Sequence, residues 1–99
     1  MKMNGILIDP ADQVVTLSEA VKAGETVSYL KAGRVYEQTA VEEIPQYHKM
    51  AVTDIGKGQR ILKYGAQIGE ATQEIAAGSW VHTHNLQSAG VRTAEKERT

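Results

Sequence analysis

Apolar residues occur along this chain in short runs, separated by glycines and polar residues. The runs are rich in β-branched residues, which favour strands, and none extends far enough to indicate a long helix. We expect strands at residues 6–8, 14–17, 26–30, 34–41, 49–52, 60–63 and 80–84. The pattern therefore predicts an all-β domain with short helical turns.

One spacing recurs three times: an apolar residue, two variable positions, a glycine, two further positions and a β-branched residue. The copies are residues 21–27, 55–61 and 75–81, centred on Gly24, Gly58 and Gly78. Each copy fits an apolar anchor, a tight turn whose glycine takes a positive φ, and the first residue of a strand. The copies are unequally spaced, so we expect a compact fold that reuses one turn and not a solenoid.

Three further segments predict local structure. Ser18 is a candidate N-cap for a helical turn over 18–23, and Pro45 would end another over 41–44. Glycines bracket residues 64–69, which predicts a hairpin-like reversal. The apolar pattern ends after residue 86, so we expect one domain at 1–86 and a tail or linker at 87–99 that only a partner would order.

Composition narrows the classes of function. The 99 residues have room for one core. Eleven basic and twelve acidic residues give a net charge of −1, so the chain lacks the positive electrostatic field that attracts nucleic acid. Cysteine is absent, which excludes disulfides and thiolate chemistry. Without a signal-like or membrane-length apolar stretch, we expect a soluble, cytoplasmic protein with neither nucleic acid nor membrane as partner.

Residues 44–58 and 61–72, followed by 81–86, resemble the SAF domain of altronate and galactarate dehydratases. The motifs that carry this resemblance, in order, are His48-Lys49, Lys63-Tyr64-Gly65 and His82-Thr83-His84-Asn85. The resemblance spans residues 6–86 and implies a β-clip fold. The sequence departs from the family at Tyr47, where a glycine usually precedes the His-Lys pair.

The resemblance implies a small subunit, or an N-terminal domain, of a sugar-acid hydro-lyase acting on altronate, galactarate or a related acid. Such an enzyme works through a large catalytic subunit or domain and typically uses a divalent metal such as iron, so we expect no activity from this chain alone and a metal bound mainly by the large partner. Two alternatives stay open: a stand-alone carbohydrate- or anion-binding module, and the small subunit of an enzyme like sulfolactate sulfo-lyase. The acid, the leaving group and homo-oligomerisation are also left open.

The histidines and lysines of these motifs are the candidate site residues. His82 and His84 are two positions apart, so on a strand they share a face and could act in catalysis or ligate a metal; the alternative is a pair of exposed edge residues. Asn85 joins them as a candidate substrate-binding residue. His48 and Lys49 could clamp an anionic substrate, or be a backbone-bonded histidine beside a solvated lysine.

The remaining candidates have stronger structural interpretations. Lys63 could face an anionic substrate, although its neighbours Tyr64 and Gly65 favour a turn. Trp80, the single tryptophan, is expected to be a packing anchor or a partner contact. The acidic residues form no acid-base pair, and we expect Asp54 and Glu74 to cap turns.

Overall fold

The computed structural model describes residues 3–88, and within that range every regular element is a β-strand. The strands are β1 (Gly5–Ile6), β2 (Val14–Leu17), β3 (Thr26–Lys31), β4 (Arg34–Thr39), β5 (Lys49–Ala51), β6 (Arg60–Lys63), β7 (Ala66–Ala71), β8 (Trp80–Val81) and β9 (Leu86–Ser88). The predicted all-β class is confirmed. No helix in the described range is long and apolar enough to cross a membrane.

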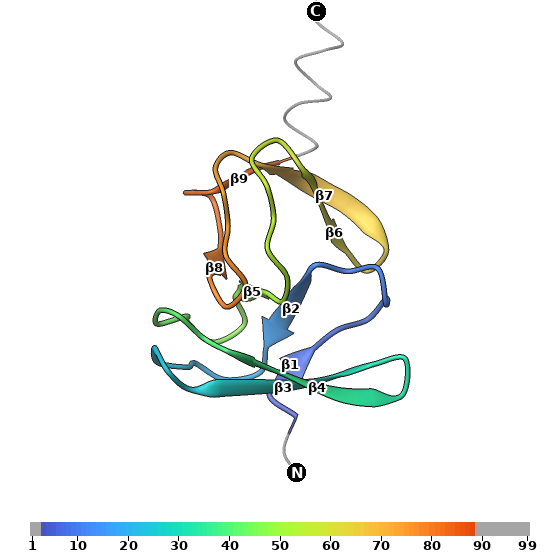
Figure 1. Ribbon diagram of the computed structural model, residues 1–99, viewed down its shortest axis with the longest axis vertical. Coiled ribbons are helices and arrows are strands. Elements are labelled where there is room, and N and C mark those ends of the chain that lie inside the picture. The colour runs from blue at the N-terminus through green and yellow to red at the C-terminus, as the bar shows by residue number, and fades with distance from the viewer. Residues whose placement is uncertain (1–2, 89–99) are drawn as a thin grey trace, which may run out of the picture.

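The strands form three antiparallel sheets, ordered β1-β2-β5-β8, β3-β4 and β6-β7-β9. In Figure 1 the four-stranded sheet lies between the other two, with the β3-β4 hairpin at one end of the molecule and β6, β7 and β9 at the other. The middle sheet therefore has another sheet on each side, against which its two faces can be buried.

Each face of the middle sheet packs against its own core. Val15, Met50 and Trp80 lie opposite one another on β2, β5 and β8, and all three contact the first core. The next residues along, Val14 and Ala51, belong to the second core. Side chains alternate across a strand, so two adjacent residues of β5 serve different cores.

The three predicted glycine turns are confirmed. Gly24, Gly58 and Gly78 have φ values of 91°, 85° and 91°, in the region that side chains with a Cβ rarely adopt. At Gly78 a Cβ would also collide with the backbone oxygen of Thr39. Glycine is thus required there for space as well as for conformation.

A fourth copy of this turn covers residues 44–50, which the sequence pattern missed. Ile44 is its anchor, Met50 is the first buried residue of β5, and Tyr47 takes the glycine's place with a φ of 69°. The Tyr47 amide donates to the Leu17 oxygen over 2.8 Å, as a turn glycine would. The anchor spacing was present in the sequence, but a bulky residue in the glycine position hid it.

The four turns form two reciprocal pairs. The anchors Val21 and Ile44 bridge each other in the first core, and Ile55 and Ile75 do so in the second. This pairing overturns the helical turns predicted at 18–23 and 41–44, because each segment contains a β-bridge residue and no helix is present there.

The reversal predicted at 64–69 is shorter than expected. Only Tyr64 and Gly65 form the turn, whereas Gly69 lies within β7, where a Cβ would collide with the Gln87 oxygen of β9. The sequence missed β7 as a strand, and it missed β9, in which Gln87 and Ser88 pair with β7. The rest of the predicted tail at 87–99 lies outside the described residues.

Candidate functional site

All three histidines of the chain gather around its single tryptophan, next to β8. The Trp80 ring centroid lies 5.5 Å from those of His48 and His82 and 5.3 Å from that of His84. His82 stacks on the indole with planes 10° apart, and its centroid is 4.9 Å from that of His48. We call these four residues the imidazole cluster.

Strand pairing and one hydrogen bond orient His48 within the cluster. Trp80 lies opposite Met50 and packs on the first core, which fixes the indole. The indole Nε1 donates to His48 Nδ1 over 3.2 Å. Because indole nitrogen can only donate, Nδ1 is the acceptor and a neutral His48 carries its proton on Nε2. His48 thus presents a donor to whatever contacts its other edge.

Asn85 holds the turn that carries the other two histidines. Its side chain is 4% exposed. Its Oδ1 accepts from the His82 amide over 2.9 Å, and its Nδ2 donates to the Trp80 carbonyl over 2.8 Å. Both ends of the amide are engaged within the chain, so the geometry gives Asn85 a positioning role. Its expected contact with substrate stays a prediction.

Partial burial lowers the pKa of His82 from its ordinary value of 6.5, and His48, Lys49 and His84 lower it further. Positive neighbours and reduced solvation both disfavour the charged ring. His82 is therefore a neutral imidazole at neutral pH. A neutral ring can accept a proton or a hydrogen bond.

The two candidate lysines do not join the imidazole cluster. Lys49 lies opposite Thr16 and Val81, on the face of β5 that points away from Met50 and Trp80. Lys63 ends β6, and its Nζ lies 4.6 Å from the Tyr64 ring centroid. The structure thus places Lys49 on the other side of the middle sheet and Lys63 on a different sheet.

The described residues do not fit a complete metal site. Within residues 3–88, no group of three or more His, Asp or Glu side chains is placed to hold a metal ion. His82 and His84 could at most add to ligands from another chain. Asp54 was expected to cap the turn that follows it, but its Oδ1 accepts from the Ala77 amide over 2.9 Å, in the paired turn at 75–78.

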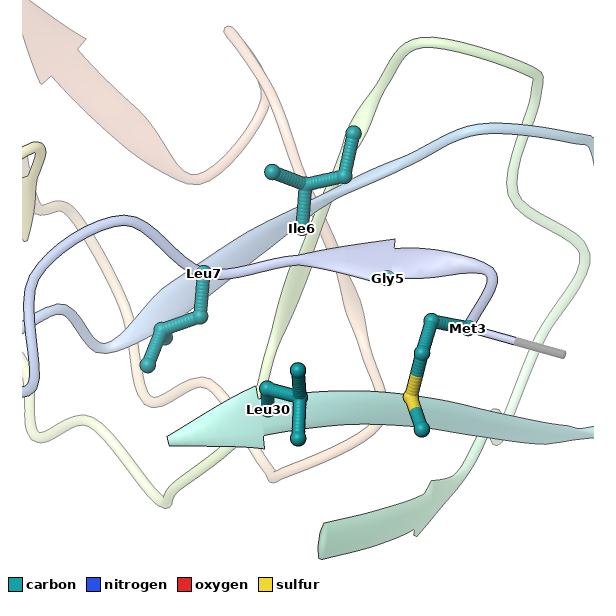
Figure 2. Close-up of a pocket in the computed structure, with 5 residues that line it drawn as sticks. All are labelled: Met3, Gly5, Ile6, Leu7 and Leu30. Carbon is teal, nitrogen blue, oxygen red and sulfur yellow. The ribbon is translucent and has the colours of Figure 1, made fainter. Parts of the chain in front are cut away.

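A hollow of about 160 Å³ between β1 and β3 is apolar and lies apart from these residues. Its lining is Met3, Gly5, Ile6, Leu7 and Leu30, and it offers no polar side chain to a sugar acid. Figure 2 shows Met3, Leu7 and Leu30 projecting toward the space between the strands, while Ile6 projects to the opposite side of β1. This hollow is not the candidate site.

Comparison with known proteins assigns the family. Residues 3–89 match the family described as the altronate/galactarate dehydratase SAF domain. The chain belongs to this family. The resemblance inferred from the three motifs is confirmed, and the all-β structure agrees with an SAF domain.

Relatives of this SAF domain differ in how much lies beyond it. Altronate dehydratase of Escherichia coli is 38% identical over 88 residues, which are 87% of this chain and 17% of that protein. Galactarate dehydratase (L-threo-forming) of the same organism is 43% identical over 54 residues, 52% of this chain and 10% of that protein. In both dehydratases the SAF domain matches a small part of the protein.

A third relative has the size of the domain itself. (2R)-Sulfolactate sulfo-lyase subunit alpha of Chromohalobacter salexigens is 30% identical over 91 residues, 89% of this chain and 97% of that protein. An SAF domain of this family thus occurs as a named subunit as well as within longer dehydratases.

Proposed function

We propose that this chain is the small SAF subunit, or the SAF portion, of a sugar-acid dehydratase and that it acts with a large catalytic subunit. The names of the relatives support a lyase, and the subunit alpha relative supports a larger partner. The observation that carries the proposal is the convergence of every histidine in the chain on Trp80.

The imidazole cluster suits the proton transfers of a dehydration. Eliminating water from a hydroxy acid breaks a C–H bond beside the carboxylate, whose electrons form the double bond, and breaks a C–O bond on the next carbon. The proton passes to a base, and the hydroxide leaves with a proton as water. We assign the base to His82, whose lowered pKa keeps it neutral. His48, oriented by Trp80, is placed to donate from Nε2 to a substrate oxygen.

We assign the divalent metal mainly to the large subunit. The described residues of this chain do not complete a metal site, so most of the ligands would come from the partner, with His82 and His84 able to add to them. No proton transfer proposed above for His82 or His48 depends on that ion.

Tyr47 supports a protein contact beside the cluster. It precedes His48, is 72% exposed, and holds a φ of 69° that costs a non-glycine residue about 1 kcal/mol. Exposed tyrosines are frequent anchors of interfaces. We propose that the large subunit covers Tyr47 and thereby closes the imidazole cluster within a shared active site.

Reconstitution tests this proposal. The full chain should show no dehydratase activity alone and should activate a cognate large subunit toward altronate or galactarate. His82→Gln should lower kcat by roughly 10²–10⁴-fold, the usual contribution of a general acid or base. The control is Lys57→Ala, which changes an exposed residue in the turn at 55–58 and should retain full activity.

A large subunit that works equally well without this chain would refute the proposal. Unchanged activity in His82→Gln, His84→Gln and His48→Gln would refute the catalytic role of the cluster alone, while leaving assembly intact.

A sulfo-lyase of the same architecture is the second candidate, because the relative of matching length is a sulfolactate sulfo-lyase subunit. Assaying the same reconstituted pair for sulfite release from sulfolactate separates the two. The dehydratase assignment predicts no sulfite.

A further inference from the structure

Two lysines lie at the edge of the second core. Each lies on the same side of its strand as a buried residue of that core. Lys49 and Ala51 are two apart on β5, and Lys63 and Ile61 are two apart on β6. Ala51 and Ile61 are both buried in the second core, so each lysine lies on the core-facing side of its strand. Both lysines therefore continue rows of residues that belong to the second core.

The surroundings of Lys49 are, on balance, unfavourable to its charged form. Partial burial lowers its pKa, Lys63 lowers it further, and Tyr64 opposes the shift. No carboxylate is among these groups. Two ammonium groups close enough to repel each other, one of them partly desolvated, are stabilised when an anion binds between them.

Thr16 adds an unused hydrogen-bond donor at the same place. Thr16 lies opposite Lys49 in the sheet, so both point to the same side. Its Oγ1 is buried and, within the described part of the chain, has no hydrogen-bond partner. Buried hydroxyls are nearly always bonded, so an unpaired one marks a place where a ligand or water completes the site.

A buried carboxylate fixes the turn that carries Lys63. Asp12 is 5% exposed, and its Oδ2 and Oδ1 accept from the amides of Tyr64 and Gly65 over 2.7 Å and 2.8 Å. Both oxygens of the carboxylate thus bond to the main chain. These bonds hold the turn that carries Lys63 in place.

We propose that Lys49, Lys63 and Thr16 form a second binding site, which we call the lysine site, for one oxyanionic group of a small acid: a carboxylate, sulfonate or phosphate. The site lies on the opposite face of the middle sheet from the imidazole cluster. It does not depend on the proposed lyase activity, because the full chain alone contains all of its residues.

Titration of the full chain with inorganic phosphate, and separately with malonate, tests the site by ¹H–¹⁵N NMR. Saturable shifts should appear at the amides of Lys49, Tyr64 and Thr16 and should weaken with added salt. Lys49→Met and Lys63→Met each keep the aliphatic stem and should weaken binding about tenfold or more, since each loses a charge-assisted contact.

Matched controls separate this site from general surface charge. Lys57→Met removes an exposed lysine elsewhere and should leave the affinity unchanged. Lys63→Met is the safer variant if Lys49→Met fails to fold, which the NMR spectrum reveals. Shifts that grow linearly, that spread over the surface, or that persist in Lys63→Met overturn the proposal.

A partner's acidic side chain is the other source of the same chemistry. If neither anion binds the isolated chain while Lys63→Met weakens assembly with a large subunit, the small-acid site is wrong and the lysines belong to an interface. Failure of the lyase assays would leave the titration unaffected, so the two proposals can fail separately.

Discussion

The two faces of β5 carry different chemistry, although their key residues are neighbours in the sequence. His48 contacts Trp80 on the side of the first core, whereas Lys49 points to the side of the second. One side is aromatic, and the other is cationic. The His-Lys motif therefore does not form a single anion clamp, because alternation along a strand separates adjacent side chains.

The two sites are nevertheless built alike. Each depends on a buried polar side chain that binds main-chain groups of a turn, Asn85 for the imidazole cluster and Asp12 for the lysine site. Each also has an exposed tyrosine at positive φ beside it, Tyr47 with 69° and Tyr64 with 57°. The buried residues determine the geometry, and the exposed ones are free to contact partners.

Replacing Asp12 should have the largest effect on stability. Asp12→Ala leaves the amides of Asp9, Tyr64 and Gly65 without their acceptor and should cost about 2–4 kcal/mol, the range for losing bonds to a buried charged acceptor. Urea unfolding measures the change, with Asp54→Ala, which loses one exposed bond, as the control. A cost no larger than the control's would mean that Asp12 does not hold this turn.

Asn85→Ala should destabilise the protein by about 2 kcal/mol, because one carbonyl and one amide lose their partners. It should also alter Trp80 fluorescence, since the turn over the indole loosens, whereas Asp12→Ala should leave that emission nearly unchanged. Gln73→Ala, which removes a 3.4 Å exposed contact, is the control. An Asn85→Ala protein with native emission and stability would contradict the positioning role.

Lowering the pH should reduce the free energy of unfolding more through the imidazole cluster than through the lysine site. The folded-state pKa of His82 lies below the unfolded value of 6.5, so the unfolded chain takes up the proton first as the pH falls. Stability from His82 is fully present above about pH 6.5 and declines below it. Urea unfolding at about pH 7 and pH 5 should show a smaller loss in His82→Gln than in the wild type. Equal losses would contradict the lowered pKa.

Tyr47→Gly should have the smallest effect on folding. Relief of the left-handed backbone is worth about 1 kcal/mol, and the greater freedom of glycine in the unfolded chain offsets roughly half to all of it. The variant should be as stable as the wild type or slightly more stable, yet bind a large subunit more weakly. Unaltered binding would remove Tyr47 from the proposed interface.

Much of the fold could be predicted from local signals. Three of the four turns are predictable because glycine marks positive φ, and β2 and β6 are predictable from their short apolar runs. The fourth turn was hidden by Tyr47. The helical turns predicted at 18–23 and 41–44 were wrong because capping propensity is local, whereas Val21 and Ile44 pair with each other across the fold.

The two sites are harder to predict from the sequence than the fold is. The motifs supplied the histidines and lysines, but nothing local indicates that His48 meets Trp80, 32 positions away, or that Asp12 binds an amide 52 positions away. Asp12 and Thr16 were not singled out at all. Their roles arise from long-range pairing, which neither composition nor spacing encodes.

The pH dependence of kcat/KM for this chain combined with a cognate large subunit tests the central claim most directly, namely that the imidazole cluster takes part in the shared active site. We predict that activity falls on the acid side with an apparent pKa below 6.5, and that Lys49→Met, which removes a positive neighbour of His82, moves this limb to higher pH. An acid limb that is identical in the wild type, Lys49→Met and His82→Gln would contradict the account.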